Sequence, residues 1–123
     1  MNISEIFNQE GTGVIATSAA DGIVNTAIYA RPHIIDEKHV AWGMTEGRTH
    51  NNVVQNPHGA YIFIIQGPGY RGVRLGLKLQ KIEESGSLLD SIKASTEKIV
   101  NPQAAQAVKY AAYFEIIEIR PLV

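Results

Sequence analysis

The segment from residue 45 to residue 52, Thr-Glu-Gly-Arg-Thr-His-Asn-Asn, has residue types and spacing that suit the binding of an anion. It joins the end of an expected strand to the start of an expected helix, which stops before Pro57. Backbone N–H groups in the first turn of a helix lack partners within the helix and carry partial positive charge. Arg48 adds a permanent cation whose forked donors match a phosphate. The segment therefore predicts a phosphate site, with a capped helix and a solvated arginine as the alternative.

The remaining candidate motifs favour structural roles. The histidines His33, His39, His50 and His58 do not have metal-site spacing, although His50 neighbours the expected phosphate site. Residues 11–13, Gly-Thr-Gly, lack the preceding strand and the following helix of a dinucleotide fingerprint. The chain has no cysteine, which excludes disulfides, zinc–thiolate sites, iron–sulfur clusters and thiol catalysis.

Length and composition indicate one soluble domain, residues 1–123. At 123 residues the chain can form one core but not two, and its 45% hydrophobic and 19% charged residues are typical of a globular protein. The net charge of −1, without a basic groove and interleaved aromatics, argues against a nucleic acid partner. The N-terminus lacks the features of a signal peptide, and no run approaches the roughly 20 apolar residues of a membrane span. We therefore expect a cytoplasmic protein without a membrane partner.

Hydrophobic periodicity predicts a mainly β protein with six strands. The expected strands cover residues 14–18, 23–35, 39–44, 61–65, 73–79 and 113–119, with helices near residues 3–7 and 48–56 and after Ser87 and Asn101. The first three strands are expected to form an antiparallel meander, with the second weakened near Pro32. The apolar run 61–65 predicts a strand buried on both faces, whereas the alternation in 73–79 predicts one solvated face. Six strands with helices between them favour a small barrel.

Several short motifs follow one another along the chain in a particular order. They are Asp21-Gly22, Val24-Asn25-Thr26, Thr45-x-x-Arg48-Thr49-x-x-Asn52-Val53-x-x-Asn56-Pro57, Gly67-Pro68-Gly69, Val73-x-Leu75-Gly76-x-x-Leu79 and Val108-Lys109-Tyr110-Ala111. In this order they resemble the pyridoxamine-5′-phosphate-oxidase-like family of proteins that bind flavin mononucleotide (FMN), with similarity from about Ile3 to Ile119. The resemblance implies a six-stranded antiparallel split β-barrel.

The same resemblance implies a non-covalently bound FMN. The residues that match its binding positions are Asn25, Thr26, Thr45, Arg48, Thr49, Gly67, Pro68, Gly69 and Tyr110. Arg48 and Thr49 match positions that hold the flavin phosphate, although many family members have lysine where this chain has Thr49. Asn25 and Thr26 match positions that line the isoalloxazine ring and the ribityl chain. The loop 67–69 matches one near the flavin, and Tyr110 falls where an aromatic side chain of the partner subunit can cover it.

By resemblance, the expected molecule is a homodimeric redox flavoprotein with its flavin at the subunit interface. We expect electron transfer or oxidoreductase chemistry with an unidentified redox partner protein or substrate, and no catalytic residue is identified. The chain shows no nucleophile–base pair, which agrees with a cofactor that supplies the redox chemistry. The alternative is a non-enzymatic module that binds a flavin, a deazaflavin or haem. Arg71, Arg74 and Lys78 could form a cationic face toward a partner, but a solubilising role is favoured.

Overall fold

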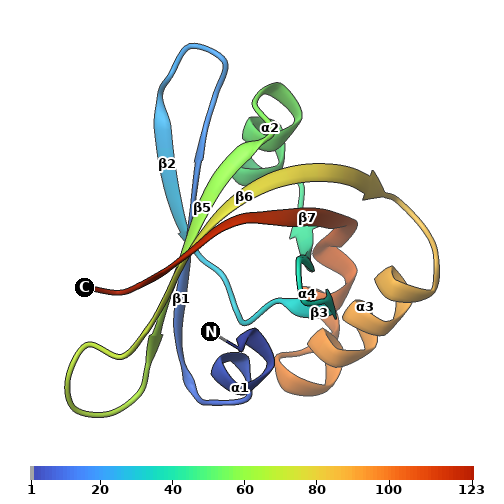
Figure 1. The fold of residues 1–123 in the computed structure, drawn as a ribbon. Coiled ribbons are helices and arrows are strands. Elements are labelled where there is room, and N and C mark those ends of the chain that lie inside the picture. The colour runs from blue at the N-terminus through green and yellow to red at the C-terminus, as the bar shows by residue number, and fades with distance from the viewer. Residues whose placement is uncertain (1) are drawn as a thin grey trace.

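The computed structural model describes residues 2–123, which form seven strands and four helices (Figure 1). In chain order these are α1 (Ile3–Phe7), β1 (Gly11–Ser18), β2 (Val24–Ile28), β3 (His33–Asp36), β4 (His39–Thr45), α2 (Arg48–Gln55), β5 (His58–Ile65), β6 (Gly72–Glu83), α3 (Ser87–Ile99), α4 (Pro102–Ala107) and β7 (Val108–Pro121). The prediction of a mainly β chain with helices between its strands is confirmed.

All seven strands belong to one antiparallel sheet with the order β2-β1-β5-β6-β7-β4-β3. The sheet curls around a core but does not close, so β2 and β3 remain its two edges (Figure 1). Inward-facing side chains of every central strand meet in this core, among them Ile15, Trp42, Tyr61, Leu75 and Phe114. Helix α1 inserts Ile3, Ile6 and Phe7 into the same core. This architecture is a split barrel, as predicted.

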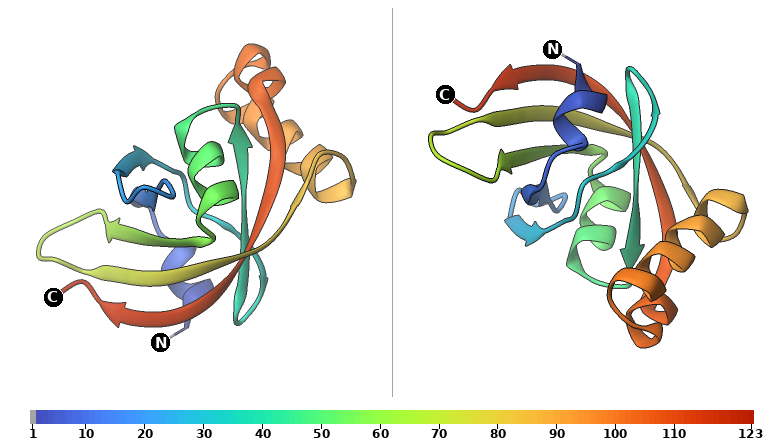
Figure 2. Two further views of the ribbon diagram at one scale, coloured as in Figure 1. Left: turned by 90° about the horizontal axis from the view of Figure 1, so that it is seen from above. Right: turned by 90° about the horizontal axis from the view of Figure 1, so that it is seen from below.

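Helices α3 and α4 cover the outer face of the sheet over β4 and β7 (Figure 2). Leu89 and Ile92 of α3 form a second buried cluster with Val108 and Ala111 of β7. Gly43 of β4 permits this approach, because a Cβ there would lie 2.6 Å from the Ile92 Cγ2 atom. A larger residue at position 43 would therefore push α3 away from the sheet.

The expected meander of the first three strands is wrong. Residues 23–35 form two strands, so the sheet has seven strands where six were predicted. Strand β2 pairs with β1, while β3 pairs with β4 at the opposite edge of the sheet. The chain leaves the ladder between Tyr29 and Pro32 because proline has no N–H to donate, and this crossover carries it from one edge to the other.

The crossover is held from inside the barrel by two aromatic side chains. The Tyr61 hydroxyl lies 3.0 Å from the carbonyl oxygen of Ala30 and 3.1 Å from that of Tyr29. The Trp42 indole N–H donates to the carbonyl of Ala30 at 2.8 Å. Burial raises the pKa of Tyr61 far above its ordinary value, so its hydroxyl remains a donor throughout the physiological range. Carbonyl groups that have no strand partner are thereby satisfied.

Strand β5 differs from its prediction. Tyr61, Phe63 and Ile65 are buried in the barrel, but Ile62 is only half-buried and Ile64 is 39% exposed. The expectation of two buried faces is therefore wrong for a single chain, because no other element covers the outer face of β5 among residues 2–123. The alternation predicted for residues 73–79 is confirmed, with Val73, Leu75 and Leu77 buried and the intervening residues more accessible.

The substitution Tyr61→Phe tests the role of the crossover bonds. It keeps the ring in the core but removes the hydroxyl donor. Ala30 keeps its bond from Trp42, whereas the Tyr29 carbonyl is left without a donor, and a buried polar group left unsatisfied costs about 1–3 kcal/mol. We expect the free energy of unfolding, measured with urea, to fall by that amount. Tyr70→Phe is the control, because Tyr70 is 78% exposed. Equal stability of the two variants would contradict this account of the crossover.

Candidate functional site

The N-terminus of α2 is open to solvent. The helix begins at Arg48, directly after β4 and a short bend, and its N-cap residue, Gly47, provides no side-chain hydrogen bond. Backbone N–H groups of the first turn therefore have no side-chain partner there, unlike those of α1, whose Asn2 caps the helix. Arg48 is exposed and takes part in none of the ion pairs formed by residues 2–123. The sequence allowed two interpretations of this segment, a phosphate site or a capped helix with a solvated arginine. The structure lacks the side-chain cap that the second interpretation includes.

Helix α2 is fixed to the end of β1 by a buried polar contact. The Asn52 side-chain amide donates to the Thr17 hydroxyl at 3.1 Å, and both residues are 4% exposed. Gln55 accepts a hydrogen bond from the Ala20 N–H at 3.0 Å. Thr17 pairs with Asn25 across the β1–β2 ladder, and alternation turns both toward the same side of the sheet. Asn25 therefore lies on the side of the sheet where α2 packs.

Thr49 connects the helix start to the crossover. Its side chain is buried and lies near the Tyr29 hydroxyl. Burial raises the pKa of Tyr29, and the neighbouring Thr49 hydroxyl opposes that rise. The Thr49 side chain thus faces the barrel, while Arg48 beside it faces solvent. The residue types alone do not indicate which of the two side chains is buried. Their positions on the first turn of α2 determine it.

An aromatic stack stands beside the helix start. The rings of His50 and Tyr110 are parallel within 5°, with centroids 3.8 Å apart. Tyr110 lies on β7 opposite Met44, and its hydroxyl donates to a Glu46 carboxylate oxygen at 3.4 Å. Desolvation and the Glu46 charge raise the pKa of Tyr110. Within a single chain Tyr110 is therefore adjacent to its own α2, whereas the family resemblance assigned it to the flavin of the partner subunit.

A hollow of about 270 Å³ lies next to Thr45. Its lining residues come from the crossover, from β4 and from α3, and they are Ile28, Tyr29, Ala30, Arg31, His33, Trp42, Gly43, Thr45, Ile92, Thr96 and Val108. Burial lowers the pKa of His33, so its imidazole is neutral at neutral pH. The hollow is slightly smaller than typical ligand pockets, which have volumes of about 300–1,000 Å³. Tyr29 belongs both to this hollow and to the Thr49 contact, which joins the hollow to the helix start.

Two parts of the predicted site lie away from the start of α2 in the structure. Thr26 points to the opposite side of β2 from Asn25 and lines a separate apolar hollow on the outer face of the sheet. Gly67, Pro68 and Gly69 form the β5–β6 hairpin, at the other end of β5 from α2 (Figure 1). Gly67 and Gly69 have positive φ angles of 127° and 79°, which favour glycine. The backbone of the hairpin therefore explains these two glycines without any contact with a ligand.

One chain thus gathers part of the predicted site at one end of the barrel. The residues brought together around the start of α2 are Thr45, Arg48, Thr49 and Tyr110, and Asn25 lies further along the helix, opposite Thr17, which contacts Asn52. Sequence reasoning missed Tyr29, and it noted His50 only as a neighbour of the phosphate site. Contacts between residues so far apart in the chain have no local pattern, so nothing in the sequence indicated them.

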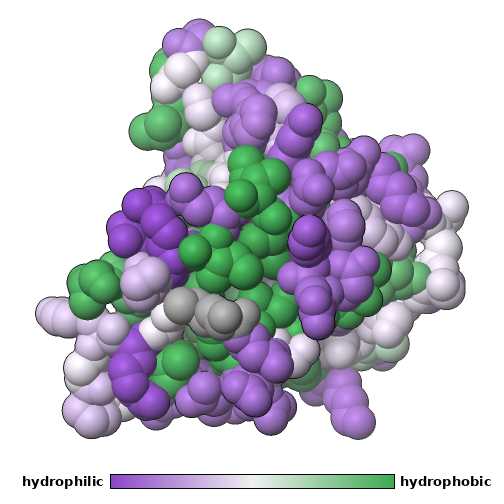
Figure 3. Space-filling view, in the orientation of Figure 1, coloured by the Kyte–Doolittle hydropathy of each residue, from purple (hydrophilic) through white to green (hydrophobic). Residues whose placement is uncertain are grey.

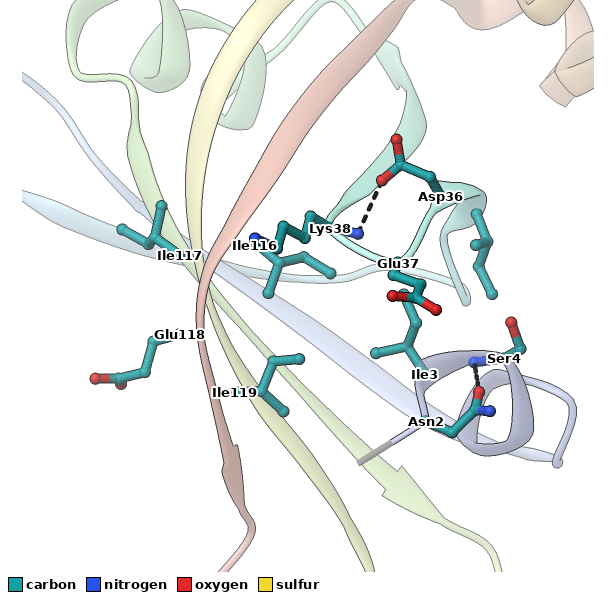
Figure 4. Close-up of a pocket in the computed structure, with 11 residues that line it drawn as sticks. Asn2, Ile3, Ser4, Asp36, Glu37, Lys38, Ile116, Ile117, Glu118 and Ile119 are labelled. Atoms are coloured by element: carbon teal, nitrogen blue, oxygen red, sulfur yellow. Dashed lines mark hydrogen bonds between the residues drawn. The ribbon is translucent and has the colours of Figure 1, made fainter.

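A hollow of about 680 Å³, larger than the one beside Thr45, lies away from these residues (Figure 4). It is bounded by α1, by the β3–β4 turn and by the second half of β7. None of the residues predicted to bind FMN lines it. Among residues 2–123 no cluster of three or more potential metal ligands occurs, and no helix has the length and apolar character needed to cross a membrane.

No protein-family model and no curated protein matches this sequence. Solved structures do match its fold. An FMN-binding protein from Syntrophomonas wolfei superposes with a TM-score of 0.85 at 17% identity, over 97% of this chain and 82% of that one. A candidate pyridoxamine 5′-phosphate oxidase from Lactobacillus delbrueckii gives 0.68 at 18% identity, over 94% and 90% of the two chains. HutZ, the haem storage protein from Vibrio cholerae, gives 0.67 at 15% identity, over 98% and 95%.

These similarities agree with the order of motifs along the chain. At identities of 15–18% they establish the arrangement of the backbone, while the site residues rest on the contacts described above. The three solved proteins differ in the ligand or activity that they are described with, so the fold alone does not select a cofactor. The chain has the split-barrel fold of the FMN-binding and pyridoxamine-5′-phosphate-oxidase-like proteins.

Proposed function

We propose that this chain binds FMN non-covalently, with the phosphate at the start of α2. The observation that carries the proposal is the uncapped helix start with the exposed, unpaired Arg48. Free N–H groups, the helix dipole and a guanidinium together form a phosphate site. The hollow beside Thr45 and the His50–Tyr110 stack provide apolar and aromatic surface next to it for a flavin ring.

The bound flavin would supply the redox chemistry, as flavins do in other proteins. Arg48 and the first turn of α2 would hold the phosphate, and Tyr29, through Thr49, would keep that turn against the barrel. Asn25 offers both a donor and an acceptor on the side of the sheet where α2 packs. We infer that the protein acts as a redox flavoprotein toward a partner protein or a small substrate.

We further propose a homodimer with the flavin at the interface of its two chains. The outer face of β2, β1 and β5 is rich in accessible apolar residues: Val14, Ala16, Val24, Ile28, Ala60, Ile62 and Ile64. Contiguous apolar surface of this kind is typical of protein interfaces. A twofold axis that reverses the strand direction would bring the 67–69 hairpin of the second copy toward α2. That arrangement would unite the two halves of the predicted site and enlarge the hollow beside Thr45.

Haem is the second candidate ligand. His33 is the one histidine that lines the hollow beside Thr45, and its lowered pKa leaves the imidazole neutral, the form that binds iron. Arg48 would then hold a propionate. The haem storage protein HutZ has the same fold. A deazaflavin fits less well, because its longer anionic tail needs more cations than the one arginine at this helix start.

The first test is the uptake of FMN. We expect about one FMN per chain, with quenched flavin fluorescence and a higher midpoint of thermal unfolding, because a ligand that binds only the native state stabilises it. The absorption spectrum of the loaded protein separates flavin, deazaflavin and haem. Preferential uptake of haem, lost in the variant His33→Ala, would replace this proposal with the second candidate.

The substitution Arg48→Glu tests the phosphate site. Replacing the cation with a carboxylate opposite a phosphate should cost several kcal/mol, so FMN affinity should fall on the order of a thousandfold. Riboflavin lacks the phosphate, and its binding should change little. Lys98→Glu, an equal change of charge at an exposed residue of α3, is the control for net charge. Equal losses for FMN and riboflavin would show that Arg48 does not act through the phosphate.

The substitution Ile64→Asp tests the proposed interface. Light scattering should show a dimer for the unchanged protein and a monomer with weakened FMN binding for the variant, since a buried unpaired charge is costly. Ile99→Asp places the same charge on α3, at a residue that is 79% exposed, and should remain dimeric. An unchanged protein that is monomeric and still binds FMN would contradict the interface.

A further inference from the structure

Within residues 2–123, five of the fourteen residues of β7 have no neighbouring strand on one of its edges. The strand runs from Val108 to Pro121 and pairs with β6 as far as its end. On its other edge the pairing with β4 ends at Glu115, followed by a hydrogen bond from the Ile116 N–H to the Lys38 carbonyl at 2.7 Å. From residue 117 to residue 121 no strand of the described chain lies on that edge. Free strand edges present N–H and C=O groups to any extended segment that approaches.

The hollow shown in Figure 4 lies along this free edge. It has a volume of about 680 Å³ and contains five isoleucines: Ile3, Ile34, Ile116, Ile117 and Ile119. Ile3 and Ile116 are buried, whereas Ile34 and Ile117 are 38% and 52% exposed on opposite sides. The space-filling view shows apolar surface in the middle of this side of the molecule, flanked by hydrophilic residues (Figure 3). An apolar floor beside a free strand edge is the combination used in strand addition.

The charges on the rim favour a neutral or basic occupant over an acidic one. Three of the four charged residues that line the hollow are acidic: Asp36, Glu37 and Glu118, against Lys38. Asp36 is paired with His39 and Glu118 with Arg120, each at 2.8 Å. Neither Glu37 nor Lys38 has an ion-pair partner among residues 2–123, and the Glu37 side chain projects from the β3–β4 turn over the hollow (Figure 4).

We propose that this groove binds an extended peptide segment of a partner protein, which adds to β7 as a further strand. The segment takes the place that β4 would occupy if β4 continued past Glu115. Five residues match the free edge from 117 to 121, and alternate aliphatic side chains meet the isoleucine floor. A basic residue in the segment faces Glu37. This surface is separate from the start of α2, so the proposal does not depend on FMN binding.

The test uses the peptide acetyl-Thr-Ile-Lys-Ile-Thr-amide and the full-length protein. At a concentration ten times the dissociation constant, amide hydrogen exchange should slow about tenfold at those N–H groups of residues 117–120 that face the free edge and not β6, since about one chain in ten remains free. The control analogue is methylated on the amide nitrogens of its first isoleucine and its lysine. Neighbouring N–H groups of an extended peptide point to opposite sides, so in either register one of these two would face β7. The analogue therefore loses a hydrogen-bond donor to β7 but keeps all its side chains. It should bind much more weakly, and the version with glutamate in place of lysine should also bind more weakly.

Protein variants complete the experiment. Ile117→Asp and Ile34→Asp change the two exposed walls of the groove and should abolish peptide binding, while Ile99→Asp on α3 should not. Circular dichroism shows whether each variant is folded. Because Ile117 and Ile34 lie on different walls of the groove, either variant alone tests the proposal if the other does not fold. Any one of three results would overturn the proposal: no saturable binding, equal binding of the methylated analogue, or binding without slower exchange at the N–H groups of residues 117–120 that face the free edge.

Discussion

The path of the chain from one edge of the sheet to the other depends on two backbone carbonyl groups, those of Tyr29 and Ala30. They belong to the crossover between β2 and β3, where no neighbouring strand can satisfy them. Tyr61 and Trp42 reach them from inside the barrel, with donor–acceptor distances of 2.8–3.1 Å. A buried carbonyl without a donor is costly, so these bonds fix the path of the crossover. That path in turn determines that β2 and β3 occupy opposite edges of one curled sheet.

The same crossover positions the candidate site. Tyr29 donates its backbone N–H to Gly13 at 2.9 Å, and its hydroxyl meets Thr49 at the start of α2. Asn52, one turn further along the helix, is held by Thr17. Thr49, Asn52 and Val53 form the buried face of α2, and Arg48 lies at the edge of that face in the first turn, where its side chain is exposed. The contacts of Thr49 and Asn52 thus fix the rotation of the helix that leaves the arginine, on which phosphate binding would depend, accessible to solvent.

Local patterns in the sequence predicted the elements well and their partners poorly. The alternation in residues 73–79 and the helix start at Arg48 depend on neighbouring residues, and both are found in the structure. The sequence also indicated that the second strand is weakened near Pro32. It did not indicate that the chain crosses to the other edge of the sheet at that point. Periodicity indicates which face of a strand is apolar and says nothing of which strand lies beside it. The contact of Tyr110 with His50 joins residues 60 positions apart, beyond the reach of any local pattern.

The composition of β5 explains why its prediction was wrong for one chain. Its inward residues are large and apolar, as the core requires, but the outward positions 62 and 64 are isoleucines as well. The neighbouring β6 has Arg74, Gly76 and Lys78 at its outward positions, as expected for a solvated face. Isoleucine at outward positions stabilises a strand only where another surface covers the side chains. Exposed apolar area of this kind favours association with such a surface. The difference between β5 and β6 therefore favours a contact over β5, β1 and β2, on the part of the outer face that α3 and α4 leave uncovered, for the dimer that we propose.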